Sequence, residues 1–412
     1  MARKRYNMKI LQLCNKFPYP LKDGAAIAST CLARALVSLG HEVSLLSMNT
    51  SKHWFDLEKL PSGFNHYRNI YTVYIDNRVK PADALLNLIS GESYHVSRFV
   101  NERFRSELKK VLESKDYDAV ILETVFTAPY IKTVREISPR TLVILRAHNV
   151  EHEIWERVAR NSGLLKKWYL NLQAGRLKKF EISAGNACDI LGTVTSRDAD
   201  TFRLLGTGHK IIRIPIGIDV RDYSENVESF SKPVSMAFIG SLDWMPNEEG
   251  LRWFLDNIWK KRLHLLFPDL TFHIAGRNAP SWLKHLDTAG VIFHGEVPDA
   301  GEFLLQHSIS VVPLLSGGGM RVKILEAMAL GRMVISTTIG MEGINPQHGV
   351  HCLIADEPGN WEEAVSGCLN GRYNPEAIGI AARSFCAVQF DNLRIAGALV
   401  DSIERYPRIS DL

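Results

Sequence analysis

The sequence predicts an α/β protein built from two doubly wound domains in tandem, with a ligand cleft between them. At 412 residues the chain is too long for one ordinary core and suits two domains. In both halves, short runs of β-branched and aliphatic residues alternate with longer helical patterns, as in parallel βαβ units. A polar stretch at 224–233 has no periodicity and ends in proline, as a linker would. Tandem domains of this class place ligands at the carboxyl ends of their strands.

The expected elements follow from these patterns in chain order. Strands of the first half are predicted at 9–14, 42–47, 119–122, 142–146, 190–193 and 210–214, with helices at 25–39, 97–113 and 155–184. The region 51–117 is less regular, and we interpret its first part as an irregular or β-rich insertion. In the second half, strands are predicted at 235–239, 271–275, 291–294, 310–313 and 334–337, with helices at 247–258, 322–329 and 381–403. We therefore expect an N-terminal domain at 1–225 and a C-terminal domain at 233–380. The C-terminal helix, within 381–412, is expected to cross back onto the N-terminal domain.

Composition excludes several classes of protein. With 46% hydrophobic and 23% charged residues, the chain is typical of a soluble globular protein, and a net charge of +4 without a basic stripe argues against a nucleic-acid binder. The six cysteines form no C-x-x-C pair, which argues against a zinc site or a disulfide framework. No signal peptide or membrane-spanning run is predicted, so we expect a cytoplasmic protein. Residues 3–5 and 166–169 would suit peripheral contact with the inner face of a membrane, but a solvated helix face is the favoured interpretation of either patch alone.

A glycine-rich segment leads directly into the helix expected at 322–329. Gly317, Gly318 and Gly319, followed by Met320, let main-chain N–H groups approach an anion closely. Arg321 and Lys323 add positive charge, and Glu326 falls about one turn inside the helix, where it can accept hydrogen bonds from ribose hydroxyls. The segment therefore suits a nucleotide diphosphate. A glycine loop with solvated cations is the alternative.

Two loops of the first half also follow predicted strands. The first contains Gly24 and Ala25 at a helix start, where N–H groups would face an anion or sugar hydroxyls, unless Gly24 only serves a tight turn. The absence of G-x-G-x-x-G there argues against a dinucleotide-dependent oxidoreductase. The second loop carries His148, Asn149 and Glu151. We expect His148 to hydrogen-bond a sugar and Glu151 to cap or orient the next helix.

The metal and nucleophile motifs in this sequence are weak. His148 and His152 have i, i+4 spacing, but H-N-V-E-H is not the zinc motif H-E-x-x-H. The D-x-D triplet at 116–118 precedes its strand, and that at 198–200 lies at a helix start, where Ser196 or Asp198 would serve as a cap. No G-x-S-x-G or Walker loop occurs, which disfavours hydrolases and P-loop enzymes. We expect no metal and no cofactor.

The chain resembles the retaining glycosyltransferases of family 4, whose fold is GT-B with two Rossmann-like domains. The resemblance covers nearly the whole chain and rests on segments that follow the family order. These are 17–24, 39–43, 146–151, 214–219, 238–242, 274–277, 293–297 and 313–329. The segment 214–219 corresponds to the family's P-N-G-V-D signature, with Ile216 in place of asparagine.

The resemblance implies that the second domain binds a UDP- or GDP-type nucleotide-sugar and that the first binds a glycan or lipid-linked acceptor. It implies transfer with retention and without metal, in the synthesis of a polysaccharide or glycoconjugate. The loops described above and the resemblance together give the candidate site residues. For catalysis they are His148, Arg321 and Lys323; for the donor they are Gly240, Arg277, Val297, Gly317, Gly318, Gly319, Met320 and Glu326; for the acceptor they are Gly24, Ala25 and Asn149.

This sequence departs from the family pattern at two places. Glu326 matches the second glutamate of the E-x7-E motif, but Gly318 stands where the first belongs. The loop at 240–244 lacks the family's diphosphate arginine, and we infer that Arg321 and Lys323 neutralise the charge instead. A nucleotide-sugar epimerase of the same fold and a non-catalytic sugar-binding protein are the alternatives; the first needs acid and base carboxylates, and the second usually has an export signal.

Overall fold

The computed structural model describes residues 7–407 except 22, 161, 209 and 225–227. The chain divides into two compact units. Unit 1 comprises Met1–Gly217 and Asn392–Leu412, and unit 2 comprises Ile218–Asp391. The described part of the expected linker 224–233 includes a short 3-10 helix, η5 (Glu228–Ser231), and belongs to unit 2.

Unit 1 contains a parallel sheet whose strand order is β3-β2-β1-β4-β5-β6-β7 among the described residues. Its strands are β1 (Lys9–Cys14), β2 (Glu42–Thr50), β3 (Ile70–Ile75), β4 (Ala119–Glu123), β5 (Leu142–Ala147), β6 (Ile190–Thr193) and β7 (Lys210–Arg213). Its helices are α1 (Gly24–Ser38), α2 (Pro81–Ser90), α3 (Tyr94–Ser97), α4 (Glu102–Ser114), α5 (Ile131–Ile137), α6 (Glu151–Arg160), α7 (Leu164–Ala187), α8 (Ser196–Leu204) and α16 (Asn392–Glu404), with short 3-10 turns η1 (Ser51–His53), η2 (Leu57–Lys59) and η3 (Val125–Tyr130).

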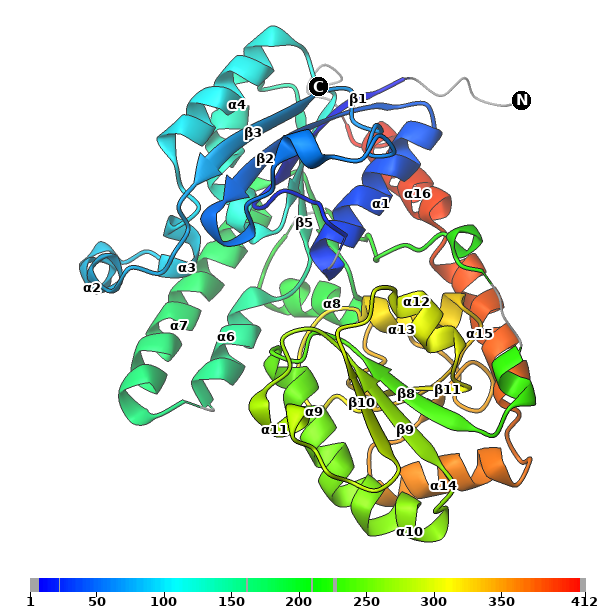
Figure 1. Ribbon diagram of the computed structural model, residues 1–412. Helices are drawn as coiled ribbons and strands as arrows, with labels where there is room; N and C mark the ends of the chain where they lie inside the picture. The colour runs from blue at the N-terminus through cyan, green and yellow to red at the C-terminus, as the bar shows by residue number, and fades with distance from the viewer. Residues whose placement is uncertain (1–6, 22, 161, 209, 225–227, 408–412) are drawn as a thin grey trace. The chain divides into compact units, whose positions relative to one another are not determined.

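Both faces of this sheet are buried, which is why its central strands are nearly continuous apolar runs. Successive side chains of a strand point to opposite faces. Ile10 accordingly joins the core that includes Leu36 of α1 and Leu399 of α16, and Leu11 joins the core that includes Leu108 of α4. Figure 1 shows α16, in red, beside α1, in dark blue.

Unit 2 repeats this plan with the strand order β10-β9-β8-β11-β12-β13, again parallel within the described chain. Its strands are β8 (Ser235–Ile239), β9 (Thr271–Ala275), β10 (Val291–Gly295), β11 (Ile309–Val312), β12 (Met333–Ser336) and β13 (Leu353–Ile354). Its helices are α9 (Met245–Phe254), the π-helical η6 (Leu255–Leu263), α10 (His264–Leu266), α11 (Ser281–Lys284), α12 (Ala300–Leu305), α13 (Val322–Ala329), α14 (Pro358–Leu369) and α15 (Pro375–Gln389); the 3-10 turn η4 (Val220–Asp222) precedes the sheet.

In each sheet the strand order reverses beside the first strand, between β1 and β4 and between β8 and β11. Loops that leave the carboxyl ends of strands on either side of such a switch point diverge, and ligands of open α/β sheets bind there. The predicted α/β class with two parallel sheets is confirmed. The loops after β1, β4, β5, β8, β9 and β11 are therefore the ones that position a site.

Several predicted elements differ from the structure in extent. The helix predicted at 155–184 is two helices, α6 and α7, and Gly163 precedes the second one. The helix predicted at 381–403 is also two helices, α15 in unit 2 and α16 in unit 1, with the break at Phe390–Asp391. The region taken as an irregular or β-rich insertion contains β3, which pairs with β2 along its full length. These breaks and pairings depend on packing partners that helical periodicity does not reveal.

Candidate functional site

In unit 2, the glycine-rich segment bends sharply before α13 begins. Gly317 and Gly319 have φ values of 118° and 75°, in the region that favours glycine. The guanidinium of Arg321 is buried and donates from Nη1 to the carbonyl oxygens of Gly318 and Gly319, the latter at 2.9 Å. A Cβ on Gly317 would lie 2.6 Å from Arg321 Nη2. The bend and the position of Arg321 are thus mutually dependent.

Lys323 occupies the first turn of α13 and is half-buried. Its Nζ donates to Asn247 Oδ1 at 2.7 Å and lies 4.4 Å from the centre of the Phe238 ring. Burial, together with the charge of Arg321, lowers the pKa of Lys323 to about 7. The structure therefore holds an amine near its titration point at the amino end of a helix, where an anion would stabilise the charged form.

The loop that follows β8 contacts one cation, Arg277, directly and is linked to a second, Lys323, through Asn247. Asn247 of α9, which holds Lys323, donates from Nδ2 to the carbonyl of Ser241 at 2.8 Å. Arg277 follows β9 and donates from Nε to Ser241 Oγ at 3.3 Å. A Cβ on Gly240 would lie 2.8 Å from Asn247 Nδ2 and 3.4 Å from Lys323 Nζ, so glycine leaves room for both.

The two remaining donor-binding candidates are placed differently. Met320 is buried, so its side chain belongs to the packing of the loop. Val297 follows β10, the strand next to β9, and is half-buried.

Glu326 lies one turn into α13, as the spacing predicts, and is half-buried. Its Oε1 accepts a hydrogen bond from the Tyr223 hydroxyl at 3.5 Å. Burial and the charge of Asp299 raise the pKa of Glu326 to about 7, against the opposing effect of the Tyr223 hydrogen bond. This carboxyl group therefore titrates near neutral pH.

Sequence reasoning missed two residues near Glu326. Arg383 of α15 donates to the carbonyls of Val220 and Tyr223, each at 2.9 Å, and also to the carbonyl of Ala329 at the end of α13. It thereby fixes the segment that brings Tyr223 to Glu326. No local pattern indicates this, because Tyr223 and Glu326 are 103 positions apart.

In unit 1, a buried carboxylate links the ends of two neighbouring strands. Glu123 ends β4 and pairs in register with Arg146 of β5; both are 1% exposed. Arg146 Nη1 lies 3.4 and 3.5 Å from the two Glu123 oxygens, and Gln12 Nε2 donates to Glu123 Oε1 at 2.7 Å. Burial alone would raise the pKa of Glu123, but Arg146 and His148 lower it to about 2.

His148 is mostly buried, and its Nε2 lies 2.6 Å from Glu123 Oε2, so Nδ1 is the ring nitrogen that Glu123 does not engage. Glu123 and Gln12 were missed from the sequence. A polar residue inside or at the end of an otherwise apolar strand is the signal that could have indicated them.

The second histidine of this segment has a different partner. His152 Nδ1 lies 2.6 Å from Oε2 of Glu181, which is on α7. His148 and His152 therefore do not converge as a metal-binding pair. Glu181 also accepts hydrogen bonds from the main-chain N–H groups of Glu151 and His152, at 2.8 and 3.0 Å. The capping role expected of Glu151 belongs to Glu181, while Glu151 Oε1 accepts from Asn149 Nδ2 at 3.2 Å.

The start of α1 also differs from the expectation. Asp23 Oδ1 accepts from the N–H groups of Ala25 and Ala26, both at 3.1 Å, and lies 2.7 Å from Lys16 Nζ. The N–H of Ala25, expected to face an anion or a sugar, is thus bound to an internal carboxylate. Gly24 is the first residue of the helix.

The two D-x-D triplets have structural partners. Asp118 Oδ2 accepts from the N–H of Lys9 at 2.9 Å. The cap of α8 is Thr195, whose hydroxyl accepts from the N–H of Asp198 at 3.0 Å, and not Ser196 or Asp198. In the part of the chain that the structure describes, no group of three or more His, Cys, Asp or Glu side chains is placed to hold a metal ion.

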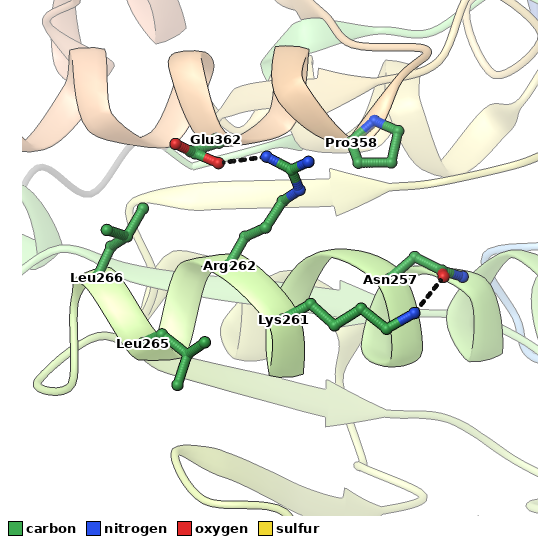
Figure 2. Close-up of a pocket in the computed structure, with 7 residues that line it drawn as sticks. All are labelled: Asn257, Lys261, Arg262, Leu265, Leu266, Pro358 and Glu362. Atoms are coloured by element: carbon green, nitrogen blue, oxygen red, sulfur yellow. Dashed lines mark hydrogen bonds and ion pairs between the residues drawn. The ribbon is translucent and has the colours of Figure 1, made fainter.

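A surface hollow of about 490 Å³ lies elsewhere in unit 2, between the η6–α10 segment and the start of α14. Figure 2 shows its lining, with Arg262 paired to Glu362 at 2.7 Å and Lys261 donating to Asn257. None of the predicted site residues lines it. Among the described helices, none is long and apolar enough to cross a membrane, and residues 3–5 lie outside the described chain.

Comparisons with known proteins agree with this architecture. Residues 233–371 match the family model of Glycosyl transferases group 1. A curated relative, described as an uncharacterized 44.6 kDa protein in the cps region of Klebsiella pneumoniae, is 24% identical over 406 residues, which is 95% of this chain and 98% of that protein.

Solved structures resemble the chain over nearly its full length. Anabaena Alr3699/HepE in complex with UDP has a TM-score of 0.64 at 13% identity and covers 96% of this chain and 100% of its own. Sucrose-phosphate synthase from Thermosynechococcus elongatus has a TM-score of 0.69 at 15% identity and covers 96% of this chain and 98% of its own. These likenesses establish the GT-B fold, and unit 2 carries the sequence pattern of Glycosyl transferases group 1.

Proposed function

We propose that this protein is a retaining, metal-independent glycosyltransferase that moves a sugar from a UDP- or GDP-type nucleotide-sugar to the hydroxyl of a glycan or lipid-linked acceptor. The family match of residues 233–371 supports the transferase class. The Klebsiella relative from a cps region supports a place in polysaccharide synthesis, and the fold is shared with a protein solved in complex with UDP-glucose.

The arrangement around α13 carries the proposal. Lys323, the amino end of the helix and Glu326 lie within two turns of one another, next to the glycine segment. A diphosphate needs positive charge and N–H donors, and a ribose needs an acceptor for two hydroxyls. Those requirements match the order of groups along 317–326.

In the proposed donor complex, Lys323 and the N–H groups of the glycine segment stabilise the diphosphate as it departs. Such stabilisation of developing charge is a large term in group transfer. The contacts of Arg321 with the Gly318 and Gly319 carbonyls favour a positioning role for it: it holds the segment in shape and adds long-range charge. Arg277, through Ser241, supplies a cation to the loop that lacks the expected arginine.

In unit 1, we assign His148 to positioning the bound sugar through a hydrogen bond of its Nδ1 atom. The ionised Glu123 fixes the ring through Nε2 and keeps it from rotating. Retention by front-face transfer needs no enzymic base, because the leaving phosphate oxygen can accept the proton of the incoming hydroxyl. Asn149 is also assigned to the acceptor, through the part of its amide that Glu151 does not engage.

The experiment is a donor screen on the full chain. Thermal shift against UDP- and GDP-sugars identifies the base, because a ligand at about 100 times its Kd stabilises by about 2.7 kcal/mol. The donor found is then incubated with lipid-linked and oligosaccharide acceptors, and nucleotide diphosphate release and the anomeric configuration of the product are measured by NMR. We expect acceptor-dependent release and a retained configuration. A product with inverted configuration would overturn the retaining mechanism. A donor that binds and is epimerised, with no transfer to an acceptor, would overturn the assignment as a glycosyltransferase.

A further inference from the structure

We propose that the first turn of α7, in unit 1, docks on an anionic lipid surface. Leu164, Leu165 and Trp168 are 88%, 89% and 62% exposed. Large apolar side chains that cluster on a surface mark an interaction site more often than isolated ones do. Figure 1 shows α6 and α7 side by side, with this turn at one end of the pair.

The direction of these side chains excludes a role in the core. At 3.6 residues per turn, Leu164, Leu165 and Trp168 fall within an arc of about 100° on the helix. The buried positions farther along α7, Leu170 and Leu177, fall on the opposite side. The apolar arc therefore points away from the buried side of α7.

Positive charge surrounds this arc. Lys166 and Lys167 flank it on the helix and are exposed, and Arg160 is exposed at the end of α6. The segment 157–168 contains four Lys or Arg residues and no Asp or Glu. Within the described residues, neither Lys166 nor Lys167 forms an ion pair. The lysine heads are thus available for phosphate or carboxylate groups of lipids.

A lipid surface suits this chemistry better than a second copy of the chain does. Leucines that enter the acyl boundary, a tryptophan at headgroup depth and flanking lysines are the composition of interfacial helices. A symmetric contact between two copies would bring the same lysines against each other, which is unfavourable. Three apolar side chains and a few cations give reversible binding, as in a peripheral protein. The inference does not depend on the proposed sugar transfer.

The test is co-sedimentation of the full chain with vesicles of phosphatidylcholine, with and without phosphatidylglycerol. We expect binding only to the anionic vesicles, and weaker binding when salt rises from about 0.1 M to about 1 M, which shortens the screening length from about 10 Å to about 3 Å. Charge reversal in the variant K166E/K167E is expected to lower the partition coefficient about tenfold or more.

A matched pair of substitutions separates this surface from general hydrophobicity. Leu165→Ser is expected to weaken vesicle binding severalfold, whereas Leu204→Ser, on α8 and 88% exposed, should leave it unchanged. Circular dichroism and the melting temperature verify that both variants are folded. Absence of binding by the unaltered chain, or equal binding by Leu165→Ser, would overturn the proposal. So would self-association in light scattering that Leu165→Ser abolishes, because the surface would then bind a second copy.

Discussion

Lys323 and Asn247 join the first turns of two helices of unit 2 through a 2.7 Å hydrogen bond from Nζ to Oδ1. Asn247 is near the start of α9, and Lys323 is in the first turn of α13. The bond orients the Lys323 amine. This amine also lies near the Phe238 ring and is affected by the charge of Arg321. An amine so placed gains most from a bound anion, and the first two predictions follow from it.

Lys323→Met removes the cation and keeps most of the side-chain length. We expect donor turnover to fall about 10²- to 10³-fold, the range seen when one donor to a developing charge is lost. Lys261→Ala is the control, because Lys261 is exposed on η6 and lines the hollow away from α13. Steady-state release of nucleotide diphosphate measures both. Equal turnover in Lys323→Met and the unaltered chain would remove Lys323 from the site.

Donor affinity should depend on pH through Lys323. Burial and Arg321 lower the pKa of Lys323 to about 7, so the amine is charged below that pH and neutral above it. Affinity for a nucleotide-sugar should therefore fall as pH rises from 6 to 8. In Lys323→Arg the side chain stays charged at every pH in this range, and the fall should disappear. Glu326 titrates in the same range, but its ionised form is the better acceptor for ribose hydroxyls, so its titration would raise the affinity with pH. A fall that persists in Lys323→Arg would therefore contradict the assignment to Lys323.

Glu326→Gln tests recognition of the ribose. We expect KM for the donor to rise about tenfold, equivalent to about 1.4 kcal/mol, with a smaller change in kcat. A 2′-deoxy donor should bind more weakly to the unaltered chain but lose little further in Glu326→Gln, since the acceptor for that hydroxyl is already altered. Glu302→Gln, exposed on α12, serves as the control. If the losses of affinity from Glu326→Gln and from the 2′-deoxy donor simply add, Glu326 does not contact the ribose.

Glu123→Gln is predicted to destabilise unit 1, because it leaves the buried Arg146 without a counter-charge. Removal of one partner of a buried pair costs about 3–5 kcal/mol. The pKa of Glu123 is lowered from 4.5 to about 2, so its contribution is complete above pH 4.5 and disappears as pH falls toward 2. Hydrogen exchange of the β4 and β5 amides localises the effect, with Glu113→Gln, exposed on α4, as control. Unchanged protection in Glu123→Gln would contradict this assignment.

Local sequence patterns were enough to predict the two βα series, most strands and the bounds of α13. Strands such as β1, β6, β8 and β9 match their predicted ranges because a buried parallel strand is a continuous apolar run bounded by turn residues. The glycine segment, Lys323 and Glu326 were found for the same reason, since their spacing along one loop and one helix is local information.

Contacts between groups that are distant in sequence follow from the folded chain. The pairing of Glu123 with His148 depends on β4 and β5 being neighbours, and Lys323 meets Asn247 only because α9 and α13 begin at the same edge of the sheet. The occupation of the α6 N–H groups by Glu181 was decided in the same way. The cap of α1 by Asp23 is different, because an Asp just before a helix is a local sequence signal. A hydrogen bond between residues far apart in sequence has no periodic signature. Only the strand order, which is a property of the folded chain, brings such pairs into contact.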